Sequence, residues 1–219
     1  VSSTVPCSTK WMVGTVNSFY IGIIATVIAT ALGTLAALGL SRPHMPYKGL
    51  IMAILISPMI VPLIITAAGM FFFYARINLV YTFTGVILAH VALATPFVVI
   101  TVTATLVGFD MNMVKAAQSL GAKPMRTFFK VIMPLILPGI ISGALFAFIT
   151  SFDEVVIVMF MASIDQLTIP KQMWAGIRQE ISPVILCMAT CLVLLSIFLL
   201  TTVELLRRRS EKLRGIKAR

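Results

Sequence analysis

The chain of 219 residues is too apolar for a soluble domain: 59% of its residues are hydrophobic, 11% are charged, and the mean hydropathy is +1.05. Typical soluble domains have about 25% charged residues. The positive charges behind the formal net charge of +10 lie in the segments that flank the apolar stretches, the pattern of membrane proteins, so we do not expect a nucleic-acid partner.

Five stretches are long enough to cross a bilayer, whose core of about 30 Å needs roughly 20 apolar residues per helix. They cover residues 18–40, 49–73, 84–107, 135–162 and 183–204. We predict an all-α fold, a polytopic transmembrane helical bundle that forms a single domain over residues 1–219. Three prolines inside these stretches are expected to interrupt spans, because each removes an internal hydrogen bond: Pro58, Pro62 and Pro96.

The 17 Lys and Arg residues alternate between rich and poor segments along the chain. Residues 41–48, 108–134 and 205–219 hold two, four and seven of them. The segments before the first span and at 74–83 hold one each, and the two in 163–182 are offset by Asp165 and Glu180. The positive-inside rule therefore predicts that the start lies outside and that the basic segments, the tail included, are cytoplasmic.

The chain begins at Val1, on the predicted outer side, without the charged and apolar regions of a signal peptide. We therefore expect that one further span precedes the five visible ones in the native protein, which would make six.

Two stripes of small residues recur every four positions: Ala25, Ala29, Gly33 and Ala37, and Gly139, Gly143 and Ala147. Small residues let transmembrane helices approach closely. We favour packing within the chain over a subunit interface as their role.

The fourth span contains two adjacent carboxylates, Asp153 and Glu154. In a continuous helix they would lie roughly 13 Å below its outer end, where each ionised carboxylate costs about 2.5–3.5 kcal/mol. We interpret the pair as a binding site for a cationic substrate; the alternative is a buried ion pair or hydrogen bonds to a neighbouring helix. His90 lies at a comparable depth and is either a second substrate contact or a packing residue.

The outer loop 163–182 is expected to form a short amphipathic helix at the membrane surface, with Pro170 at its start and Trp174, Ile177 and Ile181 on one side. Cys187 and Cys191 have no His or carboxylate nearby, so we expect buried apolar side chains and no metal site.

The 108–134 loop predicts a helix of about ten residues. Asp110 is a suitable N-cap, Gly121 a C-terminal stop, and Pro124 can begin a second helix. The first helix would carry an apolar stripe at Met113, Ala117 and Leu120. That stripe either docks a partner or packs under the membrane domain of its own chain.

The segment from Lys115 to Pro134 resembles the cytoplasmic loop signature of binding-protein-dependent ABC importer permeases: Glu-Ala-Ala, three residues, Gly, nine residues, Ile-x-Leu-Pro. Ala116, Ala117, Gly121 and Pro134 match, while Lys115 replaces the acidic residue. Further stretches resemble the spermidine/putrescine branch: Thr9 to Trp11, His90 with 96–99, Asp153 with Glu154, 167–170 and 181–183.

This resemblance implies a subunit of the bacterial inner membrane with a type I ABC importer permease fold, which imports polyamines by alternating access. It implies a second permease subunit, expected to be a different chain, two ATPase subunits and a periplasmic substrate-binding protein. It also assigns ATPase coupling to the loop residues Asp110, Lys115, Ala116, Ala117, Leu120, Gly121 and Pro134. The chain contains no G-x-x-x-x-G-K-[ST] loop, so we expect ATP and Mg²⁺ on the partner ATPase, no cofactor here, and a transporter subunit without enzymatic activity.

Two other functions stay open. A secondary transporter could use Asp153, Glu154 and His90 as a cation or proton relay, although it would usually show an inverted repeat. An ABC permease for another small solute is the second alternative, yet an oxyanion would require cationic groups where this chain places carboxylates. A membrane scaffold is the least favoured class, since it has no use for a buried acidic pair.

Overall fold

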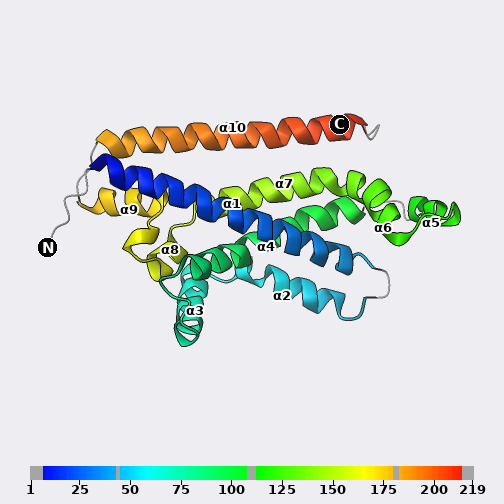
Figure 1. Ribbon diagram of the computed structural model, residues 1–219, viewed down its shortest axis with the longest axis horizontal. Coiled ribbons are helices and arrows are strands. Elements are labelled where there is room, and N and C mark those ends of the chain that lie inside the picture. The colour runs from blue at the N-terminus through cyan, green and yellow to red at the C-terminus, as the bar shows by residue number, and fades with distance from the viewer. Residues whose placement is uncertain (1–6, 43–44, 108–111, 180–182, 214–219) are drawn as a thin grey trace.

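The computed structural model describes residues 7–42, 45–107, 112–179 and 183–213, and within these ranges every regular element is helical (Figure 1). This confirms the predicted all-α fold. The longer helices are α1 (Cys7–Leu40), α2 (Lys48–Ile60), α3 (Leu63–Arg76), α4 (Phe83–Val107), α7 (Met133–Phe152) and α10 (Pro183–Leu213). The shorter elements are α5 (Asn112–Ser119), α6 (Pro124–Thr127), the π-helical turn η1 (Phe128–Ile132), α8 (Val156–Met161), the 3-10 turn η2 (Ile164–Gln166) and α9 (Ile169–Gln179).

In the described ranges, four helical stretches are long and apolar enough to cross a membrane: Lys10–Leu40, Phe83–Val107, Pro124–Phe152 and Ile185–Thr202. The second predicted span, 49–73, is not one straight helix. It consists of α2 and α3, which meet at an angle of 103°. A count of five spans therefore holds only if this bent pair is taken as one.

The bend lies at Val61 and Pro62, which we call the elbow. Val61 has extended backbone angles, φ −70° and ψ 137°, as a residue before proline prefers. Pro62 has no N–H to continue α2. The prediction that Pro58 and Pro96 also interrupt spans was wrong, because both lie inside continuous helices. A membrane helix can tolerate the loss of one internal backbone hydrogen bond.

The core is formed by α1, α4 and α7, which pack side by side along their length. The small residues Ala25, Ala29 and Ala37 are fully buried. A Cβ atom added to Gly33 would lie 2.6 Å from Val98 Cβ of α4, and one added to Gly143 would lie 3.0 Å from the Cα of the same residue. The predicted role of these stripes in packing within the chain is thus confirmed.

The predicted fourth span, 135–162, is also broken. Helix α7 ends at Phe152, three residues follow in a non-helical connection, and α8 then runs for six residues. The helical part of this span begins earlier than expected, because α6, η1 and α7 form one apolar stretch of 29 residues from Pro124 to Phe152. By length alone this stretch of about 43 Å exceeds the bilayer core.

Helix α10 lies along the outside of the bundle, next to α7 and α9 (Figure 1). Its apolar window is 6% buried, and both of its cysteines are exposed. The expectation that Cys187 and Cys191 are buried was therefore wrong: their helix is peripheral.

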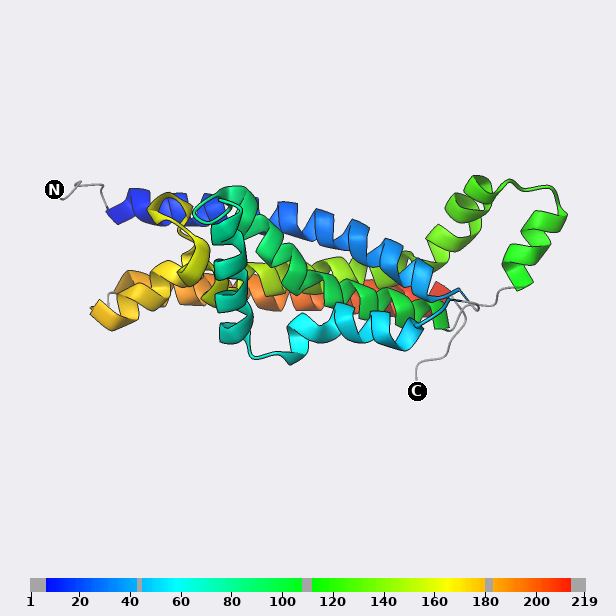
Figure 2. The same ribbon diagram turned by 90° about the horizontal axis from the view of Figure 1, so that it is seen from below.

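The helix directions place the predicted basic segments together. The last turn of α1, the first turn of α2, the α5–α6 segment and the C-terminal end of α10 lie at one end of the molecule (Figures 1 and 2). The first turn of α1, α8 and α9 lie toward the opposite end. Which end faces the cytoplasm stays a prediction from the charges.

Candidate functional site

Asp153 and Glu154 lie in the three-residue connection between α7 and α8. The expected depth of the pair assumed a helix that continues to residue 162, and this assumption was wrong. The helical stretch that ends at Phe152 begins at Pro124 and is about 43 Å long, enough to cross the bilayer core. Asp153 follows its last residue, so the carboxylates stand at the end of a membrane-length helix.

The two carboxylates have different surroundings. Glu154 is 7% exposed, and its Oε1 accepts a hydrogen bond of 2.9 Å from the N–H of Ile157, in the first turn of α8. Asp153 is exposed, and its carboxylate has no hydrogen-bond or ion-pair partner in the described part of the chain. An exposed carboxylate of this kind can bind a cation directly.

His90 is 1% exposed and lies between α4 and α7. Its Nδ1 is 2.8 Å from Ser151 Oγ, while its Nε2 is buried without a partner among the described residues. Ser151 is two positions from Asp153, so His90 is near the acidic connection, but its ring is enclosed by the helices. The geometry favours the packing role over direct substrate contact.

The elements near the N-terminal end of α1 are joined by hydrogen bonds from side chains to backbone. Asn17 Nδ2 donates to the carbonyls of Asp165 and Leu167, at 2.8 and 3.1 Å. Ser18 Oγ accepts from the N–H of Ile169 at 2.9 Å. These three hydrogen bonds fix the N-terminal half of α1 to the segment that begins α9.

Helix α9 confirms the predicted helix in the 163–182 loop. It begins at Ile169, with Pro170 in its first turn. Trp174 and Ile177 are 47% and 56% exposed, as expected for an amphipathic helix; Ile181 lies outside the described residues.

Lys171 also contacts the segment that follows the acidic connection, and this contact could not be read from the sequence. Its Nζ donates to the carbonyl oxygens of Val158 and Ala162, at 3.0 and 3.3 Å. In the sequence, Lys171 is only one of the two positive charges of the 163–182 loop. Its bond partners are 13 and 9 positions earlier, beyond two non-helical connections, so no helical periodicity could have revealed them.

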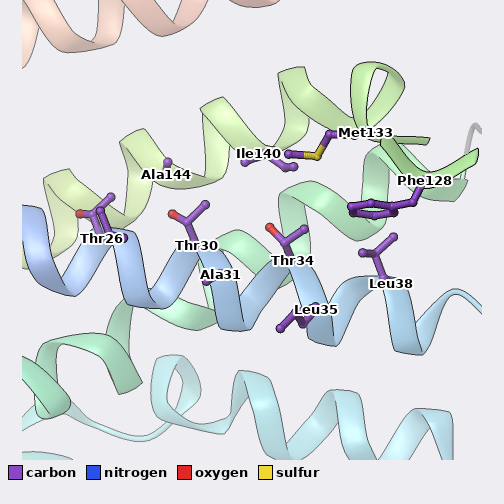
Figure 3. A pocket seen from close by; sticks show the side chains of 11 residues that line it. Thr26, Thr30, Ala31, Thr34, Leu35, Leu38, Phe128, Met133, Ile140 and Ala144 are labelled. Atoms are coloured by element: carbon purple, nitrogen blue, oxygen red, sulfur yellow. The ribbon is translucent and has the colours of Figure 1, made fainter. Parts of the chain in front are cut away.

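A cavity of about 530 Å³ lies between α1 and α7, away from the acidic connection (Figure 3). Three threonines of α1, Thr26, Thr30 and Thr34, line one side, with hydroxyl oxygens that are buried and unpartnered among the described residues. None of the eleven residues that line the cavity carries a charge. The cavity therefore lacks the anionic group that would bind a cation.

The predicted helix of the 108–134 loop is present as α5. Gly121 has φ 80° and ends the helix: its N–H bonds to Gln118 O at 2.9 Å, and the N–H of Ala122 bonds to Ala117 O at 3.1 Å. These two bonds form a Schellman motif. Pro124 begins α6 as expected. The proposed N-cap Asp110 lies outside the described residues.

Helix α5 projects beyond the end of the bundle together with α6 (Figure 2). It has no buried residue, and Met113 and Leu120 of its apolar stripe are 49% and 88% exposed. Lys115, Ala116 and Pro134 are exposed as well. Of the two roles considered for the stripe, packing under the membrane domain is therefore disfavoured.

Residues 11–212 match the family described as binding-protein-dependent transport system inner membrane component. Among curated relatives, the spermidine/putrescine transport system permease protein PotC of Haemophilus influenzae is 30% identical over 196 residues, which are 90% of this chain and 76% of the relative. The putrescine transport system permease protein PotI of Escherichia coli strain K12 is 30% identical over 181 residues, which are 79% of this chain and 64% of that protein.

Solved structures share the fold. A chain of the MetNI methionine ABC transporter in an inward-facing conformation superposes with a TM-score of 0.69 over 99% of this chain and 100% of its own length, at 18% identity. A chain of an amino acid ABC transporter gives a TM-score of 0.66 over 92% and 94%, also at 18% identity. At this identity the likeness shows the fold alone.

Proposed function

The chain belongs to the family of binding-protein-dependent transport system inner membrane components, and we propose that it is the permease subunit through which an ABC importer moves a polyamine into the cytoplasm. The observation that carries the substrate class is Asp153, an exposed carboxylate without a protein partner in the described residues, at the end of a membrane-length helix. The relatives are permeases for spermidine and putrescine, whose protonated amines such a carboxylate would bind.

The ATPase partner is expected at α5. Its exposed apolar stripe projects from the end at which the basic segments lie (Figure 2), and the positive-inside rule assigns that end to the cytoplasm. We expect two ATPase subunits, one on each permease subunit, with ATP and Mg²⁺ bound by them. In this arrangement the coupling residues are those of α5 and its stop at Gly121.

The helix that follows provides a direct connection from this segment to the substrate site. From Pro124 to Phe152 the chain is helical without a break, and Asp153 is the next residue. Because α7 is packed closely on α4 at Gly143, we expect a displacement of α5 and α6 to move α7 together with α4. Alternating access would then follow from their tilt against a second subunit.

The elbow supports a second permease subunit. Helix α2 has 13 residues, about 20 Å, so the elbow would lie within the bilayer core. Ile60 and Val61 are 74% and 39% exposed, although non-helical backbone at that depth is tolerated only when protein or a water-filled cavity covers it. We expect the second permease subunit to cover the elbow. We expect a periplasmic binding protein to deliver the substrate at the N-terminal end of α1.

The test uses the complete importer in proteoliposomes, with ATP inside and substrate-loaded binding protein outside. We expect ATP-dependent uptake of labelled spermidine or putrescine that excess unlabelled diamine suppresses and excess methionine does not. Uptake of an amino acid with no uptake of polyamine would replace the proposed substrate class. Uptake by this chain without ATPase and ATP would instead support the secondary transporter.

A further inference from the structure

Helix α8 is held at both ends by charged side chains. At its start, Glu154 Oε1 accepts from the N–H of Ile157 at 2.9 Å. At its end, Lys171 Nζ donates to the carbonyls of Val158 and Ala162 at 3.0 and 3.3 Å. Each charge has the sign that stabilises the helix terminus beside it, since an anion favours the N-terminus and a cation the C-terminus. A helix of six residues is too short to be stable by itself, so these end contacts add to the stabilisation that α8 gains from burying Ile157 and Val158.

Lys171 is itself fixed by its own helix. The neighbouring Gln172 donates to the carbonyl of Lys10 in α1 at 2.9 Å, and the first N–H of α9 bonds to Ser18. Lys171 thus reaches α8 from a helix anchored on the bundle. It is half-buried, and burial lowers the pKa of its ammonium group, as expected for a cation withdrawn from solvent.

The position of α8 controls Asp153, because only three residues separate α7 from α8. Ile157 and Val158 are fully buried, so α8 is packed inside the bundle. Any shift of α8 would therefore change the backbone of the three-residue connection that contains Asp153. We propose that Lys171 is a positioning residue: by holding the C-terminal end of α8 it fixes the direction in which the Asp153 carboxylate is presented to substrate. This inference rests on the proposed substrate role of Asp153.

The experiment compares three variants in the complete reconstituted importer. Lys171→Met removes the donor and keeps an unbranched side chain of similar length, whereas Lys171→Arg keeps a charged donor. The matched control Lys10→Met removes the same charge from the exposed N-terminal part of α1. Lys10 contributes its backbone carbonyl to Gln172, and its side chain bonds to none of the described residues. Spermidine uptake is measured against spermidine concentration at saturating binding protein, and amide hydrogen exchange is measured over 156–161.

We expect Lys171→Met to raise the KM for spermidine about tenfold, the effect of losing a hydrogen bond to a charged group, with Vmax unchanged and faster exchange over 156–161. Lys171→Arg should restore both, and Lys10→Met should change neither. Exchange over 156–161 equal to that of the unmodified protein would overturn the holding role. Faster exchange with an unchanged KM would overturn the link to Asp153. If the unmodified importer takes up no polyamine, the proposed function fails, and the exchange data still decide the role of Lys171 in α8.

Discussion

Asp153 and Glu154 are adjacent in the chain, but only one of their carboxylates is exposed. Glu154 is 7% exposed and bonded to the backbone of α8, whereas Asp153 is exposed and has no such bond within the described residues. The pair predicted from the sequence as one acidic site therefore divides into a substrate candidate and a helix-stabilising group.

Single substitutions should separate these two roles. Asp153→Asn removes the only formal charge at that position, and we expect it to lower polyamine uptake at least tenfold while the complex still assembles. Glu154→Gln keeps an oxygen acceptor for the Ile157 N–H and should lose much less; Glu154→Leu removes the acceptor and should destabilise α8 by about 0.5–2 kcal/mol, the effect of losing a helix cap. Asp165→Asn is a matched control at another exposed outer carboxylate. Equal losses for Asp153→Asn and Asp165→Asn would contradict the substrate role.

His90 and Ser151 provide a test of packing against substrate binding. Ser151→Ala would leave His90 Nδ1 buried without its partner, so we expect a loss of about 1–3 kcal/mol in stability, seen as a lower thermal midpoint of the purified complex. Uptake by the fraction that remains folded should keep its KM. A raised KM with an unchanged midpoint would restore the first interpretation of His90 as a substrate contact.

The sequence predicted the features that depend on local composition and spacing. Hydropathy located α1, α4 and α10. The apolar stripe at Met113, Ala117 and Leu120 predicted the helix, and Gly121 and Pro124 predicted its stop and the start of the next one. Pro62 predicted the break in the second span, although not its angle of 103°. The break after Phe152 was missed, because hydropathy measures transfer into the membrane and is insensitive to a change of helix direction.

The role of Lys171 was missed for another reason. Its partners in α8 come from a different element, and only the folded chain brings them together. The same holds for His90 and Ser151, which are 61 positions apart. Residue type and depth in the span made His90 a candidate ligand, whereas its burial, known only from the fold, favours the packing role.

Gly121 allows a test of the coupling segment. At φ 80° an L-residue costs roughly 1–2 kcal/mol, so Gly121→Leu should disturb the end of α5 and its angle to α6. We expect ATPase stimulation by loaded binding protein to fall, while basal ATPase activity and complex assembly persist. Gly39→Leu is the control, since a Cβ added at Gly39 meets nothing within 4 Å. Normal stimulation in Gly121→Leu would show that this stop has no part in coupling.

Gly143 tests the close approach of α7 and α4. A Cβ added there would lie 2.5 Å from Thr101 Oγ1 and 3.0 Å from Val98 Cα, and the second contact is with backbone that cannot rotate away. Gly143→Ala should therefore lower the thermal midpoint, by overpacking worth about 1–3 kcal/mol. Gly69→Ala, in open space on α3, should leave the midpoint unchanged or raise it, since alanine is the better helix former. A midpoint that rises equally in both variants would refute the tight α4–α7 contact.

The elbow yields the prediction about the partner subunit. Ile60 is 74% exposed beside non-helical backbone, which the hydrocarbon core does not tolerate without cover. A photo-reactive p-benzoylphenylalanine at position 60 should therefore crosslink to the second permease subunit in membranes that contain the complete importer. The comparison site is Leu194, 61% exposed on the continuous helix α10, where a regular helix satisfies its own backbone and lipid contact is sufficient. Crosslinking at 194 but not at 60 would place the subunit contact on α10 and leave the elbow to a water-filled cavity.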